Sequence, residues 1–145
     1  MIAIEKIKKM LEENGIEPSF QRIKIYEYLI NKKNHPTVNM IYKDLAKKIP
    51  TLSKTTVYNN LKLFEKNGMA VRLNMHDNEV RYDANTSFHG HFNCKKCGNI
   101  YDFEINHIDT NLEGVRIKEK YVNYLGICKE CINKEEGNDG SKKTN

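Results

Sequence analysis

The sequence has no tryptophan, three prolines among 145 residues, and no long hydrophobic run. A helix that crosses a bilayer needs about 20 consecutive apolar residues, so the sequence predicts no membrane span. The first ten residues, MIAIEKIKKM, carry charges every few positions and lack the uninterrupted apolar segment of a signal peptide. We therefore expect a cytoplasmic protein. In that reducing compartment the four cysteines favour metal binding or redox roles over disulfides.

Positive charge is concentrated in the first part of the chain. Residues 1–83 hold 15 Lys and Arg against 10 Asp and Glu, whereas residues 84–145 hold 9 against 9. The whole net charge of +5 therefore belongs to the first 83 residues. A polyanion partner is expected on that part, although the excess alone is weak evidence for one.

The first part also has the pattern of helices followed by a hairpin. Apolar residues recur at helical spacing in four segments, and the last three segments follow the capping residues Ser19, Thr37 and Ser53. The period then changes to 2 in residues 71–75 and 80–83, which predicts two strands joined by a turn. Together these elements predict a winged helix-turn-helix domain over residues 1–83.

The rest of the chain predicts a smaller second domain. A short polar linker occupies residues 84–88, and strand-like segments with turns fill residues 89–133, with a short helix near residues 108–113. Residues 134–145 show no periodicity, which predicts a disordered tail. The predicted fold class is therefore α+β, with an N-terminal winged helix-turn-helix and a small C-terminal α/β domain.

Two Cys-x-x-Cys pairs, separated by 30 residues, are the most specific motif of the sequence: Cys94, Cys97, Cys128 and Cys131. Each pair turns tightly enough to aim two sulfurs at one point, and two pairs supply the four thiolates of a tetrahedral Zn²⁺ site. Four buried free thiols and a thioredoxin-type redox pair are the alternatives. Neither pair lies between a strand and a long helix, which disfavours the redox interpretation.

Histidines and aspartates supply a second set of possible ligands. His89 and His91 lie two apart in a strand-like segment, which places both imidazoles on one face, and Gly90 is expected to leave the opposite face open. In isolation such a pair is more often a polar strand edge. The set of three imidazoles and two carboxylates that suits Fe²⁺ or Mn²⁺ comprises His35, Asp83, His89, His91 and Asp102. The other two histidines, His76 and His107, are expected to be solvated.

In these motifs and their order, the chain resembles the ferric uptake regulator (Fur) family, and most closely its peroxide-sensing branch. The matching stretches are SFQRIKIYEYL, HPTVNMIYKDL, SKTTVYNNLKLFEKNGM, EVRYD, HGHFNCKKCGNIYDF and GICKEC. The resemblance implies a homodimeric, metal-dependent repressor of operator DNA rather than an enzyme, with a C-terminal dimerisation domain. It also places a structural zinc on the four cysteines and a regulatory Fe²⁺ or Mn²⁺ on His35, Asp83, His89, His91 and Asp102.

The resemblance distinguishes two functions. Peroxide sensors of the family carry Asp at both carboxylate positions, as Asp83 and Asp102 do here, and become oxidised at a histidine ligand, for which His35 and His89 are the candidates. The alternative is a metal-uptake regulator for Fe, Mn or Zn without peroxide sensing. Residues 108–127 contain no His, which speaks against the extra metal site of many iron-uptake members.

The fourth helix is the expected DNA-recognition element, because the N-terminal part of this helix enters the major groove in helix-turn-helix proteins. Its outward residues and one arginine of the second helix form the predicted contact set: Arg22, Lys54, Thr55, Thr56, Tyr58, Asn59 and Lys62. Tyr58 and Asn59 would contact bases, and the cations would contact phosphates. A merely solvated helix face is the alternative. Two departures from the family are Glu17, where a basic residue is usual, and a shortened stretch between the cysteine pairs that truncates the dimerisation helix.

Two hypotheses from other classes remain. A metalloenzyme would turn over a substrate without DNA, but the sequence offers no Gly-rich phosphate cradle and no Ser or Cys nucleophile with a base. A zinc-based redox chaperone would lose zinc on mild oxidation before any histidine changed.

Overall fold

The computed structural model describes residues 2–75 and 77–138, and the chain divides into two compact units between Thr86 and Ser87. That division falls within the predicted linker. Unit 1 contains α1 (Ile4–Glu13), α2 (Phe20–Lys32), α3 (Val38–Ala46), α4 (Lys54–Lys66), β1 (Val71–Asn74) and β2 (Val80–Asp83). Unit 2 contains β3 (Gly90–Cys94), β4 (Ile100–Phe103), β5 (Asn123–Gly126) and α5 (Lys129–Asn138). None of the described helices is long and apolar enough to cross a membrane.

Side-chain caps set the starts of three helices, as the sequence predicts. The hydroxyl oxygens of Ser19, Thr37 and Ser53 accept hydrogen bonds from the backbone N–H three residues later, over 3.2, 3.1 and 3.0 Å. Each cap satisfies an N–H group that would otherwise lack a partner at the helix start. The caps therefore fix where α2, α3 and α4 begin.

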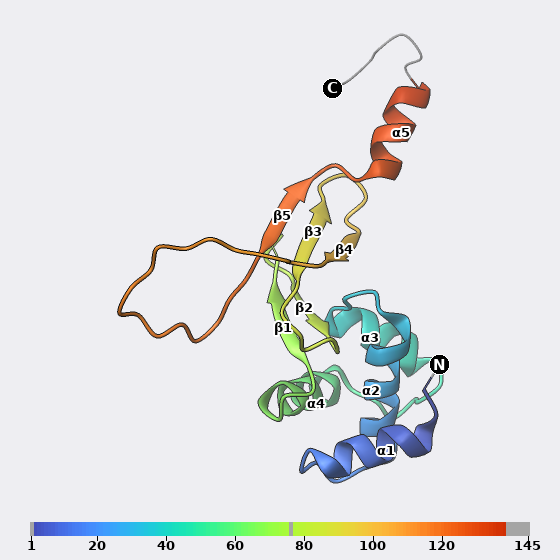
Figure 1. Ribbon diagram of the computed structural model, residues 1–145. Coiled ribbons are helices and arrows are strands. Elements are labelled where there is room, and N and C mark those ends of the chain that lie inside the picture. The colour runs from blue at the N-terminus through green and yellow to red at the C-terminus, as the bar shows by residue number, and fades with distance from the viewer. Residues whose placement is uncertain (1, 76, 139–145) are drawn as a thin grey trace. The chain divides into compact units, whose positions relative to one another are not determined.

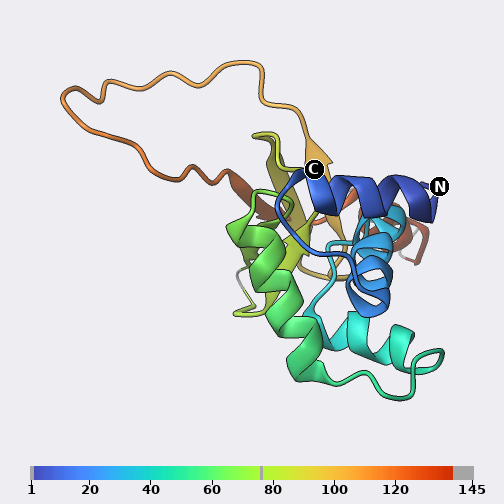
Figure 2. The same ribbon diagram turned by 90° about the horizontal axis from the view of Figure 1, so that it is seen from below.

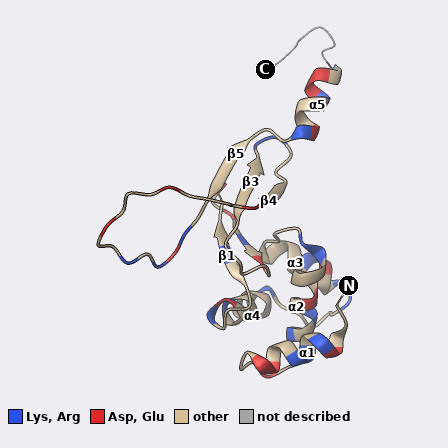
Figure 3. Ribbon diagram, viewed as in Figure 1, with Lys and Arg blue, Asp and Glu red and all other residues tan. Residues whose placement is uncertain are grey.

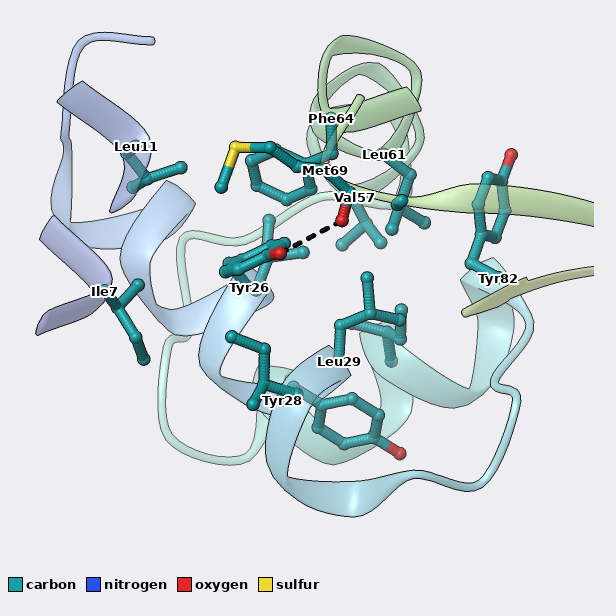
Figure 4. Packing of buried hydrophobic residues seen from close by; sticks show 14 of the residues in the cluster. Ile7, Leu11, Tyr26, Tyr28, Leu29, Val57, Leu61, Phe64, Met69 and Tyr82 are labelled. Carbon is teal, nitrogen blue, oxygen red and sulfur yellow. Dashed lines mark hydrogen bonds between the residues drawn. The ribbon is translucent and has the colours of Figure 1, made fainter. Parts of the chain in front are cut away.

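A hydrophobic core holds the helices of unit 1 together (Figure 4). Ile7, Val57 and Leu61 are fully buried, and Tyr26 packs edge-on against Phe64 with ring centroids 5.0 Å apart. The hydroxyl of Tyr26 donates to the carbonyl of Met69 over 3.0 Å, and Met69 lies just before β1. This buried hydrogen bond ties α2 to the start of the hairpin.

The hairpin that follows α4 completes a winged helix-turn-helix. Strands β1 and β2 are antiparallel with Val71 opposite Asp83, and Tyr82 points into the core with 1% of its surface exposed. Helices α3 and α4 contact each other, and β2 contacts α2. The hairpin is the wing, and the predicted architecture of unit 1 is confirmed.

Unit 2 is a three-stranded sheet with α5 at its end (Figure 1). Strand β3 is central, antiparallel to β4 and parallel to β5. Two parallel neighbours need a long crossover connection. Residues 95–122 make this connection, and they include β4. The part after β4, residues 104–122, is a segment without helix or strand that extends away from the sheet (Figures 1 and 2).

Two predictions for unit 2 are wrong. The short helix expected near residues 108–113 is absent, because the apolar residues of this segment have no surface of unit 2 to pack on and stay exposed. The tail expected to be disordered from Lys134 is helical as far as Asn138, since α5 continues from the second cysteine pair. Residues 139–145, the rest of that predicted tail, and His76 lie outside the described residues.

Candidate metal centres and nucleic-acid interface

The four cysteine sulfurs of unit 2 meet at one point. All four Sγ atoms lie within 4.8 Å of one another, with 3.7 Å between Cys94 and Cys131 and 3.8 Å between Cys97 and Cys128. Four sulfurs bound at about 2.3 Å around a tetrahedral Zn²⁺ ion would lie about 3.8 Å apart. A disulfide would join two sulfurs at about 2.05 Å. The four free thiols therefore have the spacing of a closed tetrahedral metal site.

Strand register brings the two cysteine pairs together. Cys94 ends β3 opposite Gly126 of β5, so Cys128 follows two residues after the paired strands. The turn after Cys94 closes with a hydrogen bond from the N–H of Gly98 to the carbonyl of Cys94, over 3.0 Å. Gly98 has φ of 77°, which glycine adopts without strain. The parallel pairing of β3 and β5 thus joins motifs that are 30 residues apart in the sequence.

Backbone amides stabilise negative charge on two of the sulfurs. The N–H groups of Cys97 and Cys128 donate to Sγ of Cys94 over 3.5 and 3.4 Å. The N–H of Cys97 lowers the pKa of Cys94 to about 6, and the N–H of Cys131 lowers the pKa of Cys128. Donation of the Cys131 thiol to Cys128 raises the pKa of Cys131 to about 12. Charge is thus unequally shared among the thiols, and a bound cation is needed to keep all four as thiolates.

In unit 1, one histidine faces one carboxylate. His35 lies in the loop between α2 and α3 with 6% of its surface exposed, and its Nε2 is 3.5 Å from Oδ2 of Asp83. Asp83 ends β2. Strand β2 also holds the loop, because Nη1 of Arg81 donates to the carbonyl of His35 (3.1 Å) and the N–H of Tyr82 to the carbonyl of Pro36 (3.0 Å).

In unit 2, two histidines face one carboxylate. His91 of β3 pairs with Asp102 of β4, and Oδ1 of Asp102 lies 3.5 Å from Nε2 of His89 and 3.4 Å from Nε2 of His91. Nδ1 of His89 lies 2.7 Å from the carbonyl of Ser87. A carbonyl only accepts, so Nδ1 is the nitrogen that donates here, and Nε2 is the nitrogen through which a neutral His89 would bind a metal.

The donor spacing in both units fits a divalent cation. Two donors bound at about 2.1 Å to one ion lie about 3.0 Å apart at a right angle and about 3.4 Å apart at the tetrahedral angle. The histidine–aspartate distances of 3.4 to 3.5 Å match the upper value and exceed ordinary N–H···O hydrogen bonds of about 2.7–3.2 Å. His89, His91 and Asp102 also form a two-histidine, one-carboxylate set, which suits Fe²⁺ with open positions.

Gly90 lies between the two histidines, and the expectation that it leaves the opposite face of the strand open is wrong. The face behind the imidazoles is filled rather than open, because the ring of Phe103 crosses Gly90 and stacks on Tyr124 at 5.0 Å. A Cβ at position 90 would lie 2.2 Å from that ring. The missing side chain thus lets an aromatic pair join β4 to β5 across β3.

Helix α4 presents a polar face that is separate from its buried face. Lys54, Thr55, Asn59 and Lys62 are exposed, and Tyr58 is 44% exposed with Nζ of Lys62 5.6 Å from its ring centroid. Thr56 is half-buried, and its hydroxyl lies 2.9 Å from that of Ser53 in the helix cap. Figure 3 shows positive charge along this helix, and the helix sequence has Glu65 as its acidic residue. The face combines cations, which can contact phosphates, with an aromatic ring and an amide, which can contact base edges.

Comparison with known proteins identifies the family. The sequence profile of the ferric uptake regulator family matches residues 13–124. The chain belongs to the ferric uptake regulator family. It is 37% identical over 143 residues to the peroxide operon regulator of Bacillus subtilis, covering 92% of this chain and 99% of that protein.

Solved structures of the Fur family agree. Peroxide-sensing PerR from Streptococcus pyogenes is 31% identical, with a TM-score of 0.53 over 90% of this chain and 94% of that one. The ferric uptake regulator of Helicobacter pylori is 23% identical, with a TM-score of 0.67 over 90% of this chain and 94% of that one, and it shows the shared fold alone. Members of the family are transcription regulators rather than enzymes.

One predicted DNA contact of this Fur-family chain is engaged within unit 1. Arg22 donates from Nη1 to the carbonyl of Glu17 (2.9 Å) and from Nε to Oδ1 of Asn60 (3.0 Å). Asn60 is 8% exposed and donates from Nδ2 to the carbonyl of Thr56 over 2.8 Å. Asn60 is not among the residues predicted from the sequence, and its signal there is an amide placed on the apolar face of α4 beside Val57 and Leu61.

The remaining histidine that the structure describes lies in a surface pair. Nε2 of His107 is 2.6 Å from Oδ1 of Asp109, and both side chains are exposed, at 77% and 94%. Such a solvated pair contributes little to stability. His107 therefore matches the expectation of a solvated histidine.

Proposed function

We propose that this chain is a metal-dependent, peroxide-sensing repressor that binds operator DNA as a homodimer in the cytoplasm. The observation that carries the proposal is aspartate at both carboxylate positions. Asp83 in unit 1 and Asp102 in unit 2 each lie within 3.5 Å of a histidine Nε2, and the resemblance to the family associates this pair of aspartates with its peroxide sensors. The relatives from B. subtilis and S. pyogenes support the same branch.

Zn²⁺ on Cys94, Cys97, Cys128 and Cys131 would have a structural role. The 3.7 and 3.8 Å spacings of the sulfurs favour a tetrahedral ion whose four positions are all filled by protein. A closed site of this kind leaves no position for a substrate. Zinc would therefore stabilise unit 2 and take no direct part in sensing.

The regulatory ion, Fe²⁺ or Mn²⁺, would take donors from both units. Unit 1 supplies two donors and unit 2 supplies three, so either set alone leaves at least half of the positions of a six-coordinate ion to water. The proposed five ligands are His35, Asp83, His89, His91 and Asp102. One position would remain for H₂O₂. Bound Fe²⁺ would supply one electron to H₂O₂, whose O–O bond would break into hydroxide and a hydroxyl radical, and this radical would oxidise an adjacent imidazole, at His35 or His89.

Shared ligation would make DNA affinity depend on the ion. Residues 84–88 join the units, and an ion that both units bind restricts the freedom of this linker. The ion would thus lower the cost of ordering the two α4 helices of a dimer on DNA. A coupling of about 1–3 kcal/mol changes DNA affinity roughly 5–150-fold, and DNA must tighten metal binding by the same factor.

The DNA contacts would come from the exposed face of α4. Tyr58 and Asn59 would contact base edges, and Lys54 and Lys62 would contact phosphates with help from Thr55 and the positive helix end. Thr56 and Arg22 also belong to the proposed contact set. Thr56 lies in the first turn of α4, and Arg22 has further guanidinium N–H groups that could contact a phosphate. The hydrogen bonds that both residues make within unit 1 favour a supporting role for them.

Homodimerisation is supported by the surface of unit 2. Its two outer strands, β4 and β5, border the sheet, and many of its large apolar side chains are exposed. These are Phe88, Tyr101, Ile108, Leu112, Val115, Ile117, Tyr121, Tyr124, Leu125 and Ile132. Exposed apolar surface and open strand edges are usual at protein–protein interfaces.

The test uses DNA selected from a random pool by the Mn²⁺-loaded protein. A gel-shift assay then compares Fe²⁺, Mn²⁺ and Zn²⁺, each with and without H₂O₂. We expect H₂O₂ to release DNA from the Fe²⁺ form only, with +16 Da on the peptide bearing His35 or His89 in mass spectrometry. Metal-dependent binding that H₂O₂ leaves intact, without any added oxygen, would establish the metal-uptake regulator instead.

Asp102→Glu is the matched variant for this test. The longer carboxylate keeps a ligand but moves it, so we expect metal-dependent DNA binding to persist and histidine oxidation to slow. Unchanged oxidation at equal H₂O₂ would remove Asp102 from the sensing role.

A further inference from the structure

His35 has a backbone conformation that it would not keep by itself. Its φ is 49°, in the left-handed region, and it precedes Pro36. Few residues other than glycine adopt positive φ, and those that do need support from their surroundings. With 6% of its surface exposed, His35 must hold this conformation inside the protein. The conformation sets the direction of the imidazole, so whatever supports it also sets the position of Nε2.

Strand β2 supplies this support at two consecutive peptide groups. Arg81 donates from Nη1 to the carbonyl of His35 over 3.1 Å, and the N–H of Tyr82 donates to the carbonyl of Pro36 over 3.0 Å. The Arg81 side chain is 14% exposed, and its Nη1 also lies 3.8 Å from Sδ of Met40. The Tyr82 contact belongs to the backbone and survives most substitutions. Arg81 is therefore the support that a mutation can remove.

We propose that Arg81 is a positioning residue of the regulatory metal site, which holds His35 in its left-handed conformation so that the imidazole stays opposite Asp83. The proposal rests on the proposed function, since it concerns the same ion. Its consequence is that both ligands of unit 1 depend on one strand of the wing. Asp83 ends β2, and His35 is fastened to β2 through Arg81. Metal bound by this pair would cross-link the loop to the wing, so that wing order and metal occupancy are linked.

Electrostatics and positioning predict opposite effects for the loss of Arg81. A guanidinium beside a cation site repels the cation. The exposed carboxylate of Glu79, 3.6 Å from Nη2 of Arg81, only partly offsets this charge. Removal of the charge alone should therefore tighten metal binding. Removal of the support should weaken it, because groups that orient a metal ligand typically contribute roughly 10–100-fold in affinity. The sign of the change thus decides between the two effects.

The experiment titrates zinc-loaded, full-length protein with Co²⁺ and follows the visible absorption of Co²⁺, which reports its nitrogen and oxygen ligands. The variants are Arg81→Met, Arg81→Lys and the control Arg72→Met. Arg72 lies on β1 opposite Tyr82, its side chain is 48% exposed, and it contacts Glu65 rather than the loop. We expect Arg81→Met to weaken Co²⁺ binding by at least about 10-fold, Arg81→Lys to recover part of the loss, and Arg72→Met to change it less than about twofold.

A second measurement separates positioning from loss of folding. Fe²⁺-loaded protein is treated with H₂O₂, and the ratio of +16 Da at the His35 peptide to that at the His89 peptide is measured. We expect this ratio to fall in Arg81→Met, while circular dichroism shows the helices of unit 1 intact. Co²⁺ affinity in Arg81→Met that equals or exceeds that of the wild type would overturn the proposal. Absence of a nitrogen-ligated Co²⁺ site in the wild type would instead refute the regulatory site itself.

Discussion

The two units of this protein are stabilised in different ways. The buried hydrophobic cluster of the described chain draws its members from residues 7–82, all in unit 1. In the described part of unit 2, the buried hydrophobic side chains are those of Cys94 and Cys128. A segment with so small an apolar core needs another source of stability. The core of unit 1 can therefore stabilise this unit without metal, whereas in unit 2 metal binding on the four thiols would be part of folding.

Loss of the thiol site should have the largest effect, and it should affect unit 2 alone. We expect Cys94→Ser to unfold unit 2, because a structural zinc contributes roughly 10–16 kcal/mol to folding in small zinc peptides. Hydrogen exchange measured by mass spectrometry should show fast exchange over residues 87–138 and unchanged protection in α1 to α4. Light scattering should show a monomer, since the proposed dimer surface lies in unit 2. Protection of β3 to β5 in the variant, or an intact dimer, would contradict the assignment.

A cavity in the core of unit 1 should have the converse effect. Leu61 is fully buried, and Leu61→Ala should lower the free energy of unfolding of unit 1 by about 2–5 kcal/mol. Chemical denaturation followed by circular dichroism at 222 nm, a wavelength that reports helix, measures this change, and zinc content measured in parallel should stay at one ion per chain. Lys62→Ala, one residue along on the exposed face, is the control. If Leu61→Ala released zinc as readily as Cys94→Ser, the two units would not be independent.

Local chemistry explains what could be predicted from the sequence. Ser19, Thr37 and Ser53 determine helix starts through bonds to the next turn, and the change of period at residue 71 marks the wing. The Cys-x-x-Cys spacing predicts the thiol cluster because each pair is a local turn. These features depend on residues a few positions apart, and such features follow from a single sequence.

Features that depend on distant partners could not be predicted. The Arg81–His35 and Arg22–Asn60 hydrogen bonds join residues 46 and 38 positions apart, and nothing local indicates either pair. The helix expected near residues 108–113 has apolar residues, but a helix of that length needs a surface to pack on, which unit 2 does not offer. The spacing of residues within β3 predicts an open face behind Gly90, whereas that face is filled by Phe103 of the neighbouring strand.

An added methyl group at Gly90 should have an intermediate effect within unit 2. Its Cβ would lie 2.2 Å from the Phe103 ring, so Gly90→Ala should displace that ring and cost about 1–3 kcal/mol, as other overpacked sites do. The displaced β4 would also move Asp102 away from the histidines. Thermal unfolding of the zinc-loaded protein and Mn²⁺ affinity measure the two effects. Gly137→Ala, with nothing within 4 Å of the new Cβ, is the matched control. Equal stability and Mn²⁺ affinity in both variants would show that Phe103 moves aside without consequence.

The smallest effects on stability are expected on the exposed face of α4, where DNA binding should change instead. Tyr58 is 44% exposed and Lys62 lies over its ring, so Tyr58→Ala and Lys62→Ala should each change the free energy of unfolding of unit 1 by less than about 0.5 kcal/mol.

The two variants should lose different properties of DNA binding. Tyr58→Ala should lose about 1–3 kcal/mol on the selected sequence and relax base preference, because it removes a base contact. Lys62→Ala should weaken binding to all sequences about equally and lower the salt dependence, since it removes a phosphate contact. Fluorescence anisotropy on selected and scrambled DNA at two salt concentrations separates these outcomes. An equal loss on both DNAs for Tyr58→Ala would mean that the aromatic ring contributes no base recognition. The exposed face of α4 would then bind DNA through its positive charge alone.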